Sequence, residues 1–325
     1  MPLLLAACGD NVAIPPEPPV GTDPLQQPPA NTVGGFRIQI PETTLAPGQE
    51  IEPCFIFPLE ITGPSRIVGG AVLHTQPGMH HGNITTRHKT GEGIRSCPPN
   101  DGDPATDVIN GGGNVLFGSS TQISGDEWYR FADGEGYRVL DSFEIVARMH
   151  FLNPTDEELT VAPSYEWFTI DEATLTNELG AFIWMYNNFE IPPLSQKTVT
   201  AHCDLPGDHP MHVVSLLPHM HALGTSLDAS YAGGPFDGEK FLDSPGYDPD
   251  NGVLVQYDPP IDLEPVRGFS FSCTWNNTLP VTIREGVGDN EMCMIFGYAW
   301  PVDKAFTALA NDDAPCFTFA TPPPE

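Results

Sequence analysis

Prolines and glycines divide this chain into short segments. The sequence contains 36 prolines and 32 glycines, spread over its whole length. Proline interrupts helices and glycine favours turns, so the apolar segments between them suit strands joined by turns better than long helices. Residues 36–40, for example, alternate apolar with polar side chains, which is the period of a half-buried strand. We therefore predict an all-β protein.

Strand-like segments recur along most of the chain. They lie at residues 36–40, 52–61, 66–75, 142–153, 198–204, 212–217, 253–257, 269–275 and 292–300. This density of short strands favours β-sandwich or jelly-roll domains. A chain of 325 residues has room for two domains of about 100–200 residues each. We expect an N-terminal domain at 35–178, a C-terminal domain at 179–320 and a short tail at 321–325.

The N-terminus indicates export. Residues 3–8, LLLAAC, resemble a bacterial lipobox, so residues 1–8 are interpreted as the end of a truncated signal in which Cys8 receives the lipid. No basic residue precedes Arg37, so the true start is expected further upstream. The alternative is a short apolar N-terminus with an incidental cysteine. Residues 9–34 contain seven prolines and should form an extended tether.

Charge and cysteine content limit the partners and the compartment. Acidic residues outnumber Lys and Arg by 43 to 13, which gives a net charge of −30, so we expect no nucleic-acid partner. The six cysteines after Cys8 suggest three disulfides and an oxidising compartment, although they allow about 15 pairings. The predicted location is the periplasm or cell surface, anchored to the outer membrane through Cys8.

Two histidine pairs are candidate metal ligands. His219 and His221 are two residues apart, and on a strand this spacing places both side chains on one face. His80 and His81 are adjacent, and adjacent side chains on a regular strand point to opposite faces. Both can therefore bind one ion only at a turn, a bulge or a strand end.

Two further residues could complete these sites. Met292 lies in the motif EMCM, and His150 ends the apolar run at 143–150. Imidazole suits copper in both oxidation states and thioether sulfur favours Cu(I), so the combination indicates redox copper. Each residue also has an ordinary alternative, because a single His150 could be hydrogen-bonded in the core and Met292 could simply pack there.

The order and context of these elements resemble the copper type II, ascorbate-dependent monooxygenases, the family of peptidylglycine α-hydroxylating monooxygenase and dopamine β-monooxygenase. The similarity runs from about Phe36 to Phe317, and it is closest at residues 210–213, 219–224 and 291–293. The resemblance implies two tandem jelly-roll domains with a copper-lined cleft between them. It also implies three disulfides: Cys54–Cys97, Cys203–Cys316 and Cys273–Cys293.

The resemblance implies two copper ions, one per domain. The ion of the first domain would store and deliver an electron across a solvent-filled cleft, and its ligands would be His80, His81 and His150. The ion of the second domain would bind and activate O2 next to the substrate, and its ligands would be His219, His221 and Met292. Ascorbate or another reductant would supply the electrons.

The expected substrate pocket departs from the family pattern. The peptide-amidating enzyme has an arginine where this chain has Leu217, and an asparagine and a tyrosine where it has Met294 and Phe296. An apolar pocket follows, so the expected substrate is small and apolar or aromatic rather than peptidylglycine. We therefore predict an exported copper monooxygenase that hydroxylates a C–H bond. The alternatives are a non-catalytic copper carrier and a surface β-sandwich module with vestigial histidines.

Overall fold

The computed structural model describes residues 26–98, 107, 113–118, 125–207, 210–247, 254–286 and 290–321. Within these residues β-strands dominate, joined by turns and by short 3-10 helices such as η2 (Glu172–Thr174). No helix in this part of the chain is long and apolar enough to cross a membrane. Cys8, most of the predicted tether and most of the predicted tail lie outside the described residues. The all-β prediction is confirmed.

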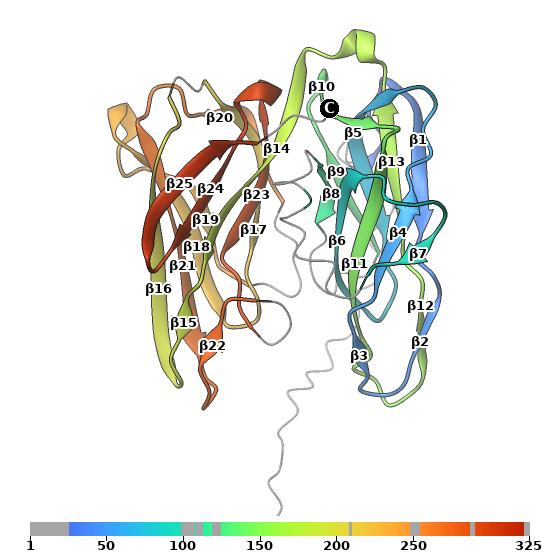
Figure 1. The fold of residues 1–325 in the computed structure, drawn as a ribbon, viewed down its shortest axis with the longest axis horizontal. Helices are drawn as coiled ribbons and strands as arrows, with labels where there is room; N and C mark the ends of the chain where they lie inside the picture. Colours follow the sequence, from blue (N-terminus) through green and yellow to red (C-terminus); the bar gives the residue numbers. More distant parts are fainter. Residues whose placement is uncertain are drawn as a thin grey trace, which may run out of the picture.

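The N-terminal domain is a sandwich of two sheets, on the right in Figure 1. Its first sheet has the order β1 (Thr32–Gln39), β13 (Ser164–Ile170), β5 (Ser65–His74) and β10 (Glu135–Leu140), with β9 (Asp126–Arg130) also paired to β5. Its second sheet has the order β7 (Arg95–Ser96), β4 (Cys54–Pro58), β11 (Phe143–Leu152), β6 (Met79–His88) and β8 (Val115–Gly118), with β3 (Glu50–Ile51) on β11. A small ladder joins β2 (Thr43–Leu45) to β12 (Leu159–Val161).

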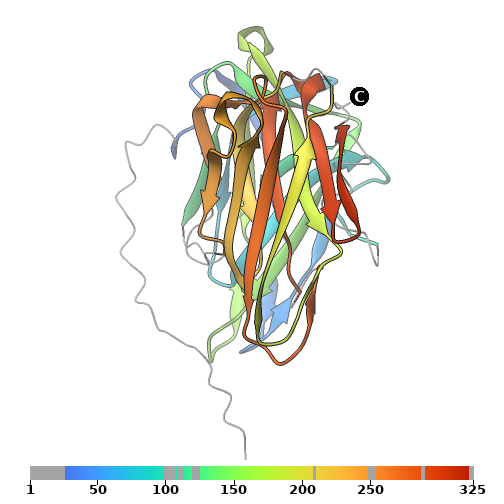
Figure 2. The ribbon, with the colours of Figure 1, turned by 90° about the vertical axis from the view of Figure 1, so that its left-hand side faces the viewer.

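The C-terminal domain is a second sandwich, whose strands face the viewer in Figure 2. One layer has the order β14 (Asn177–Asn187), β23 (Met294–Trp300), β17 (His212–His219) and β20 (Val255–Asp262), extended by β24 (Phe306–Asn311) and β25 (Ala314–Ala320). The other has the order β16 (Ser195–Asp204), β21 (Gly268–Asn277), β18 (Gly224–Ala232) and β19 (Lys240–Ser244). A short pair joins β15 (Glu190–Ile191) to β22 (Ile283–Arg284).

One sheet continues from the first domain into the second. Strands β10 and β14 pair in parallel, with Glu135 beside Asn177 and Tyr137 beside Leu179. The predicted domain boundary after residue 178 lies near the start of β14, which pairs with β10 up to Leu179 and with β23 from Gly180. The parallel pairing fixes the orientation of the two sandwiches relative to each other.

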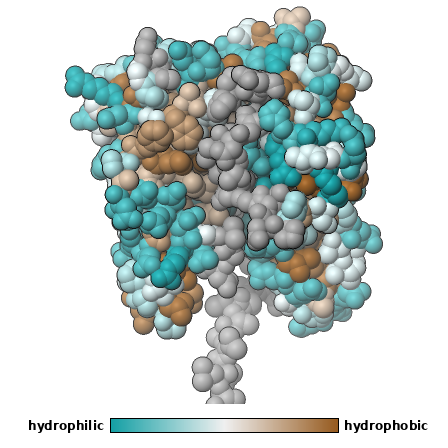
Figure 3. Space-filling model, viewed as in Figure 1, coloured by the Kyte–Doolittle hydropathy of each residue, from teal (hydrophilic) through white to brown (hydrophobic). Residues whose placement is uncertain are grey.

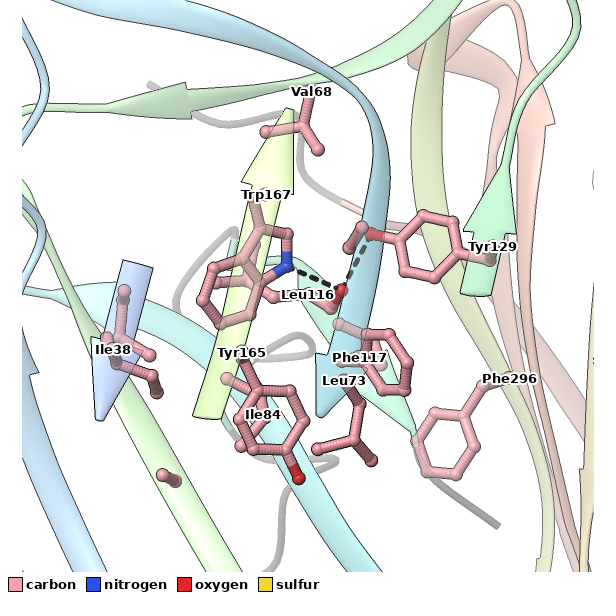
Figure 4. Packing of buried hydrophobic residues seen from close by; sticks show 14 of the residues in the cluster. Ile38, Val68, Leu73, Ile84, Leu116, Phe117, Tyr129, Tyr165, Trp167 and Phe296 are labelled. Carbon is pink, nitrogen blue, oxygen red and sulfur yellow. Dashed lines mark hydrogen bonds between the residues drawn. The ribbon is translucent and has the colours of Figure 1, made fainter. Parts of the chain in front are cut away.

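An apolar cluster fills the space between the domains. It contains Phe117 and Tyr137 from the first domain and Phe296 and Tyr298 from the second. Figure 4 shows Phe117 close to Phe296, and it shows the Leu116 carbonyl accepting hydrogen bonds from side chains of the first domain. The Tyr298 hydroxyl donates to the Val115 carbonyl across the domain interface. Strand β8 is therefore held by both sandwiches.

The first strand begins earlier than predicted. Strand β1 starts at Thr32, inside the segment expected to form the tether, and pairs with β13 up to Ile170. This start was not predicted because Gly34 and Gly35 interrupt the alternation of apolar and polar side chains. Gly35 is required there, since a Cβ atom would lie 2.3 Å from the Trp167 carbonyl oxygen.

The three disulfides are confirmed as Cys54–Cys97, Cys203–Cys316 and Cys273–Cys293. Each stays within one domain. The last one joins β21 to the residue after Met292. On the surface, the face seen in Figure 3 is largely hydrophilic, with smaller hydrophobic groups, as expected for a chain of net charge −30.

Candidate metal centre

A β-bulge brings the adjacent histidines of the first domain to one place. In the pairing of β6 with β11, His81 lies opposite His150 and Met79 lies opposite Phe151, so His80 is an extra residue in β6. A bulge turns one side chain toward the face of its neighbour. Both histidines can share one ion only at such a break, and the structure has it at that position. Gly78, with a φ of 91°, precedes the strand in the left-handed region that favours glycine.

The three histidines of the first domain form a compact cluster. His80, His81 and His150 each offer a ring nitrogen, and these nitrogens all lie within 4.8 Å of one another. The Nδ1 atoms of His80 and His81 are 2.9 Å apart. Two bonds of ~2.0 Å to one ion at roughly a right angle place their nitrogens about 3 Å apart, so this spacing fits two ligands of one metal.

The orientation of His150 leaves one nitrogen for a metal. Its Nε2 lies 2.5 Å from Glu50 Oε1, so the carboxylate accepts a hydrogen bond from that side of the ring. Its Nδ1 is buried and, within the described part of the chain, has no hydrogen-bond partner. A carboxylate on the far nitrogen is the usual partner of a metal-binding histidine, because it fixes the tautomer and makes the ligand nitrogen more basic. The donor set therefore fits a metal ion.

Burial keeps the imidazoles of His80 and His81 neutral. Desolvation lowers the pKa of His80 to about 4, with the neighbouring His150 acting in the same direction. Desolvation also lowers the pKa of His81 well below its usual value. Among the neighbouring histidines, His219 lowers this pKa most. A metal ligand must have its nitrogen lone pair free. These residues are therefore ready to bind a cation at neutral pH.

The histidines of the second domain lie at the end of β17. His219 is the last residue of that strand, and His221 comes just after it, so only His219 lies on the strand as predicted. Their ring centroids are nevertheless 5.2 Å apart. The pKa of His219 is lowered to about 3 by burial and by the nearby His221. His221 Nδ1 donates to the Asn290 carbonyl at 2.7 Å, which leaves Nε2 as its ligand atom.

A buried carboxylate holds the turn that carries His221. Glu291 accepts hydrogen bonds from the backbone N–H groups of His221 and Leu223, at 2.9 and 2.7 Å, and from Trp275 Nε1 at 2.9 Å. Burial raises the pKa of Glu291, and its N–H donors act in the opposite direction. All three of these groups donate, so the ionised carboxylate is the form that satisfies them.

The same contacts locate Met292. In the pairing of β17 with β23, His219 lies opposite Met294, and the next pair on that face would be His221 with Met292. The bonds from residues 290 and 291 to His221 agree with this extension. Met292 is 6% exposed, and the Cys273–Cys293 bridge holds the backbone beside it. The structure thus places the methionine at the strand end that carries the two histidines.

The two histidine clusters lie directly beside each other. The ring centroids of His81 and His219 are 6.4 Å apart, although the residues are far apart in the sequence and belong to different domains. Tyr247 of the second domain also reaches the first cluster, with its hydroxyl 3.5 Å from His80 Nε2. The resemblance implied a solvent-filled cleft between the clusters. At this point the rings of the two domains are neighbours instead.

A cavity lies along the face of β17 and β23 that carries Leu217 and Phe296. The empty space within it, open solvent included, is about 410 Å³. Both domains line it, with Phe117, Tyr129 and Phe131 from the first and Leu217, Phe296 and Tyr298 from the second. The ring of Phe296 is 6.4 Å from that of His219, so the cavity adjoins the second histidine pair.

Leu217 and Phe296 therefore line the cavity, as the predicted pocket requires, whereas Met294 does not. Met294 lies opposite His219 and packs in the apolar cluster between the domains. Glu50 and Glu291, which orient the histidines, were not predicted from the sequence. Nor was the part of the cavity wall that β8 and β9 form. Glu291 carries a weak local signal, an acidic residue next to a ligand candidate in an apolar segment, but Glu50 is 100 residues from His150 and carries none.

Comparison with protein families and with curated proteins finds no match. Among solved structures, the major capsid protein P2 of bacteriophage PM2 is 10% identical, with 82% of this chain and 97% of that chain covered and a TM-score of 0.27. The Macrobrachium rosenbergii nodavirus structure is 12% identical, with 92% and 98% covered and a TM-score of 0.18. Likenesses at these TM-scores carry no argument about function.

Proposed function

We propose that this protein is a copper-dependent monooxygenase that hydroxylates a C–H bond of a small apolar or aromatic molecule. One oxygen atom of O2 enters the C–H bond, and the other leaves as water with two electrons and two protons from a reductant such as ascorbate. Copper, when bound, would supply the oxidation and reduction chemistry that the side chains lack. His80, His81 and His150 would hold one ion, and His219, His221 and Met292 a second.

One observation carries the proposal. Two sets of metal-ligand side chains from different domains meet at His81 and His219, and an apolar cavity adjoins the second set. A copper carrier needs ligands but no cavity for a second molecule. A β-sandwich with vestigial histidines has no requirement for the buried, unpartnered Nδ1 of His150. The geometry therefore favours an enzyme.

The protein side chains would position the substrate and exclude water. Phe117 from the first domain and Phe296 from the second both line the cavity and lie in the apolar cluster between the domains. A water-poor site protects reactive species from side reactions. The apolar walls offer no charged partner for a substrate carboxylate, which agrees with Leu217 at the position where the peptide-amidating enzyme has an arginine. The three disulfides fit export to an oxidising compartment, with Cys8 as the proposed lipid anchor.

Oxygen uptake tests this function. Copper-loaded protein with ascorbate should consume O2 faster when a suitable apolar substrate is present, and product carrying one oxygen atom from labelled O2 should appear. A panel of alkylbenzenes and small hydrophobic alcohols would serve as substrates. Tight copper binding without substrate-dependent uptake or product would favour the carrier instead.

Copper stoichiometry tests the site assignment. The metal-stripped protein should bind two copper ions per chain, and Met292→Ile should remove Cu(I) binding at one of them, because only a sulfur ligand gives that site its preference for the reduced ion. Copper content and Cu(I) titration with a competing chelator would measure both. Met211→Ile is a suitable control, since Met211 comes just before β17, at the opposite end of that strand from His219, and packs inside the second sandwich. One ion or none in the unmutated protein would contradict two separate sites.

A further inference from the structure

One polar side chain stands out in the wall of the apolar cavity. Ser215 lines it and is only 1% exposed, and its Oγ has no hydrogen-bond partner among the residues that the structure describes. The lining tyrosines differ, because Tyr129 donates to the Leu116 carbonyl and Tyr298 to the Val115 carbonyl. A buried hydroxyl without a partner is costly to maintain, so its presence needs an explanation.

A second bulge places this hydroxyl at the cavity. In the pairing of β17 with β23, Val213 lies opposite Ala299 and Ser215 lies opposite Tyr298, so Val214 is an extra residue. Val213 packs in the cluster inside the second sandwich, whereas Val214 packs in the cluster between the domains. The bulge therefore turns both Val214 and Ser215 toward the cavity side. Bulges of this kind re-aim side chains beside functional sites.

Ser215 and the histidine pair share one face of β17. Ser215, Leu217 and His219 alternate along the strand, and four residues of strand span about 13 Å. Leu217 lies between the two ends and lines the cavity wall. A molecule that contacts Ser215 at one end would thus extend past Leu217 toward His219.

We infer that Ser215 is a specificity-determining residue for an elongated apolar ligand with one terminal hydroxyl or carbonyl oxygen. The Ser215 hydroxyl can donate to either group and accept from a hydroxyl, and rotation about its Cα–Cβ bond suffices to turn it toward the ligand. The opposite, apolar end of the ligand would lie beside His219. This role of Ser215 deepens the proposed function. That the apolar end is hydroxylated rests on the proposed function, whereas binding of the polar end by Ser215 does not.

Two isosteric probes test this inference. 4-Propylphenol and 4-propyltoluene differ only by hydroxyl against methyl, and their binding to the full chain in its copper-free form can be followed by NMR of the Leu217 and Leu254 methyl groups, which line the cavity. Ser215→Ala should weaken 4-propylphenol binding about tenfold and leave the Kd of 4-propyltoluene within about twofold. Because the Ser215 hydroxyl has no partner, the substitution should not impair folding.

Ser244→Ala is the matched control. Ser244 also has a buried Oγ without a partner, but it lies at the end of β19, outside the cavity lining. It should change neither Kd. Equal changes for both probes with Ser215→Ala, no change, or no methyl shift with either probe would overturn the inference. The binding test measures no turnover, so it is independent of the oxygen-uptake test. Ser215-dependent binding without oxygen uptake would refute only the monooxygenase. Oxygen uptake without Ser215-dependent binding would refute only the role of Ser215.

Discussion

Replacing His150 with alanine should lower the copper content from two ions to one and reduce turnover by more than about 100-fold, since losing only an outer-shell partner already costs ~10–100-fold at other metal sites. The remaining ion should stay with His219, His221 and Met292. The apo-protein should melt close to the unmutated apo-protein, because Nδ1 of His150 has no partner among the described residues and its Nε2 is bonded to Glu50, a largely exposed carboxylate whose ion pair contributes only ~0–1 kcal/mol. Copper analysis, Cu(I) titration and calorimetry of the apo-protein measure these quantities.

His88→Ala is the control for this experiment. His88 is an exposed histidine at the other end of the β6–β11 pair, opposite Phe143. It should leave copper content and turnover unchanged. If apo-His150→Ala melts several degrees early and still binds two ions, His150 is a structural residue and the first site uses another ligand.

Replacing Glu291 with glutamine should lower the free energy of unfolding by roughly 3–5 kcal/mol, because hydrogen bonds to a charged group contribute ~1.5–3 kcal/mol each and a buried donor without a partner costs ~1–3 kcal/mol. One carboxylate oxygen accepts from His221 and Trp275, and the other accepts from Leu223. A glutamine amide must turn its NH2 group toward at least one of these N–H donors. The turn that carries His221 would then shift.

Urea unfolding of the apo-protein and copper content together measure this effect. We expect a lower midpoint and a loss of the second ion, with the His80, His81 and His150 site retained. Glu264→Gln, at an exposed position of the same domain, should change neither quantity. An unchanged midpoint with Glu291→Gln would mean that the carboxyl group is already neutral in the native protein.

The sequence predicted the parts of the site that depend on local spacing. The need for a bulge at His80 and His81 followed from the side-chain period of a strand, and the pairing with β11 has that bulge. Strand β6 itself was missed, because Gly82 and the polar residues around it read as a turn. Gly82 is required by packing, since a Cβ atom there would lie 2.5 Å from the Tyr165 hydroxyl.

The relative position of the two clusters could not be predicted. His81 and His219 meet because β10 pairs with β14 and because β8 packs against Tyr298. These contacts join segments up to 183 residues apart, and no local pattern encodes them. The contact between Glu50 and His150 could not be predicted either, because the two residues are 100 positions apart in the sequence.

The sheet shared by both sandwiches bears on how this protein loses its structure. A hinge between the domains would have to separate the β10–β14 pair and expose the apolar cluster that contains Phe117, Tyr137 and Phe296. Burial on that scale couples the two halves into one cooperative transition. A ligand held in the cavity would contact both halves, so its binding energy would be added to the stability of the whole chain rather than to one domain.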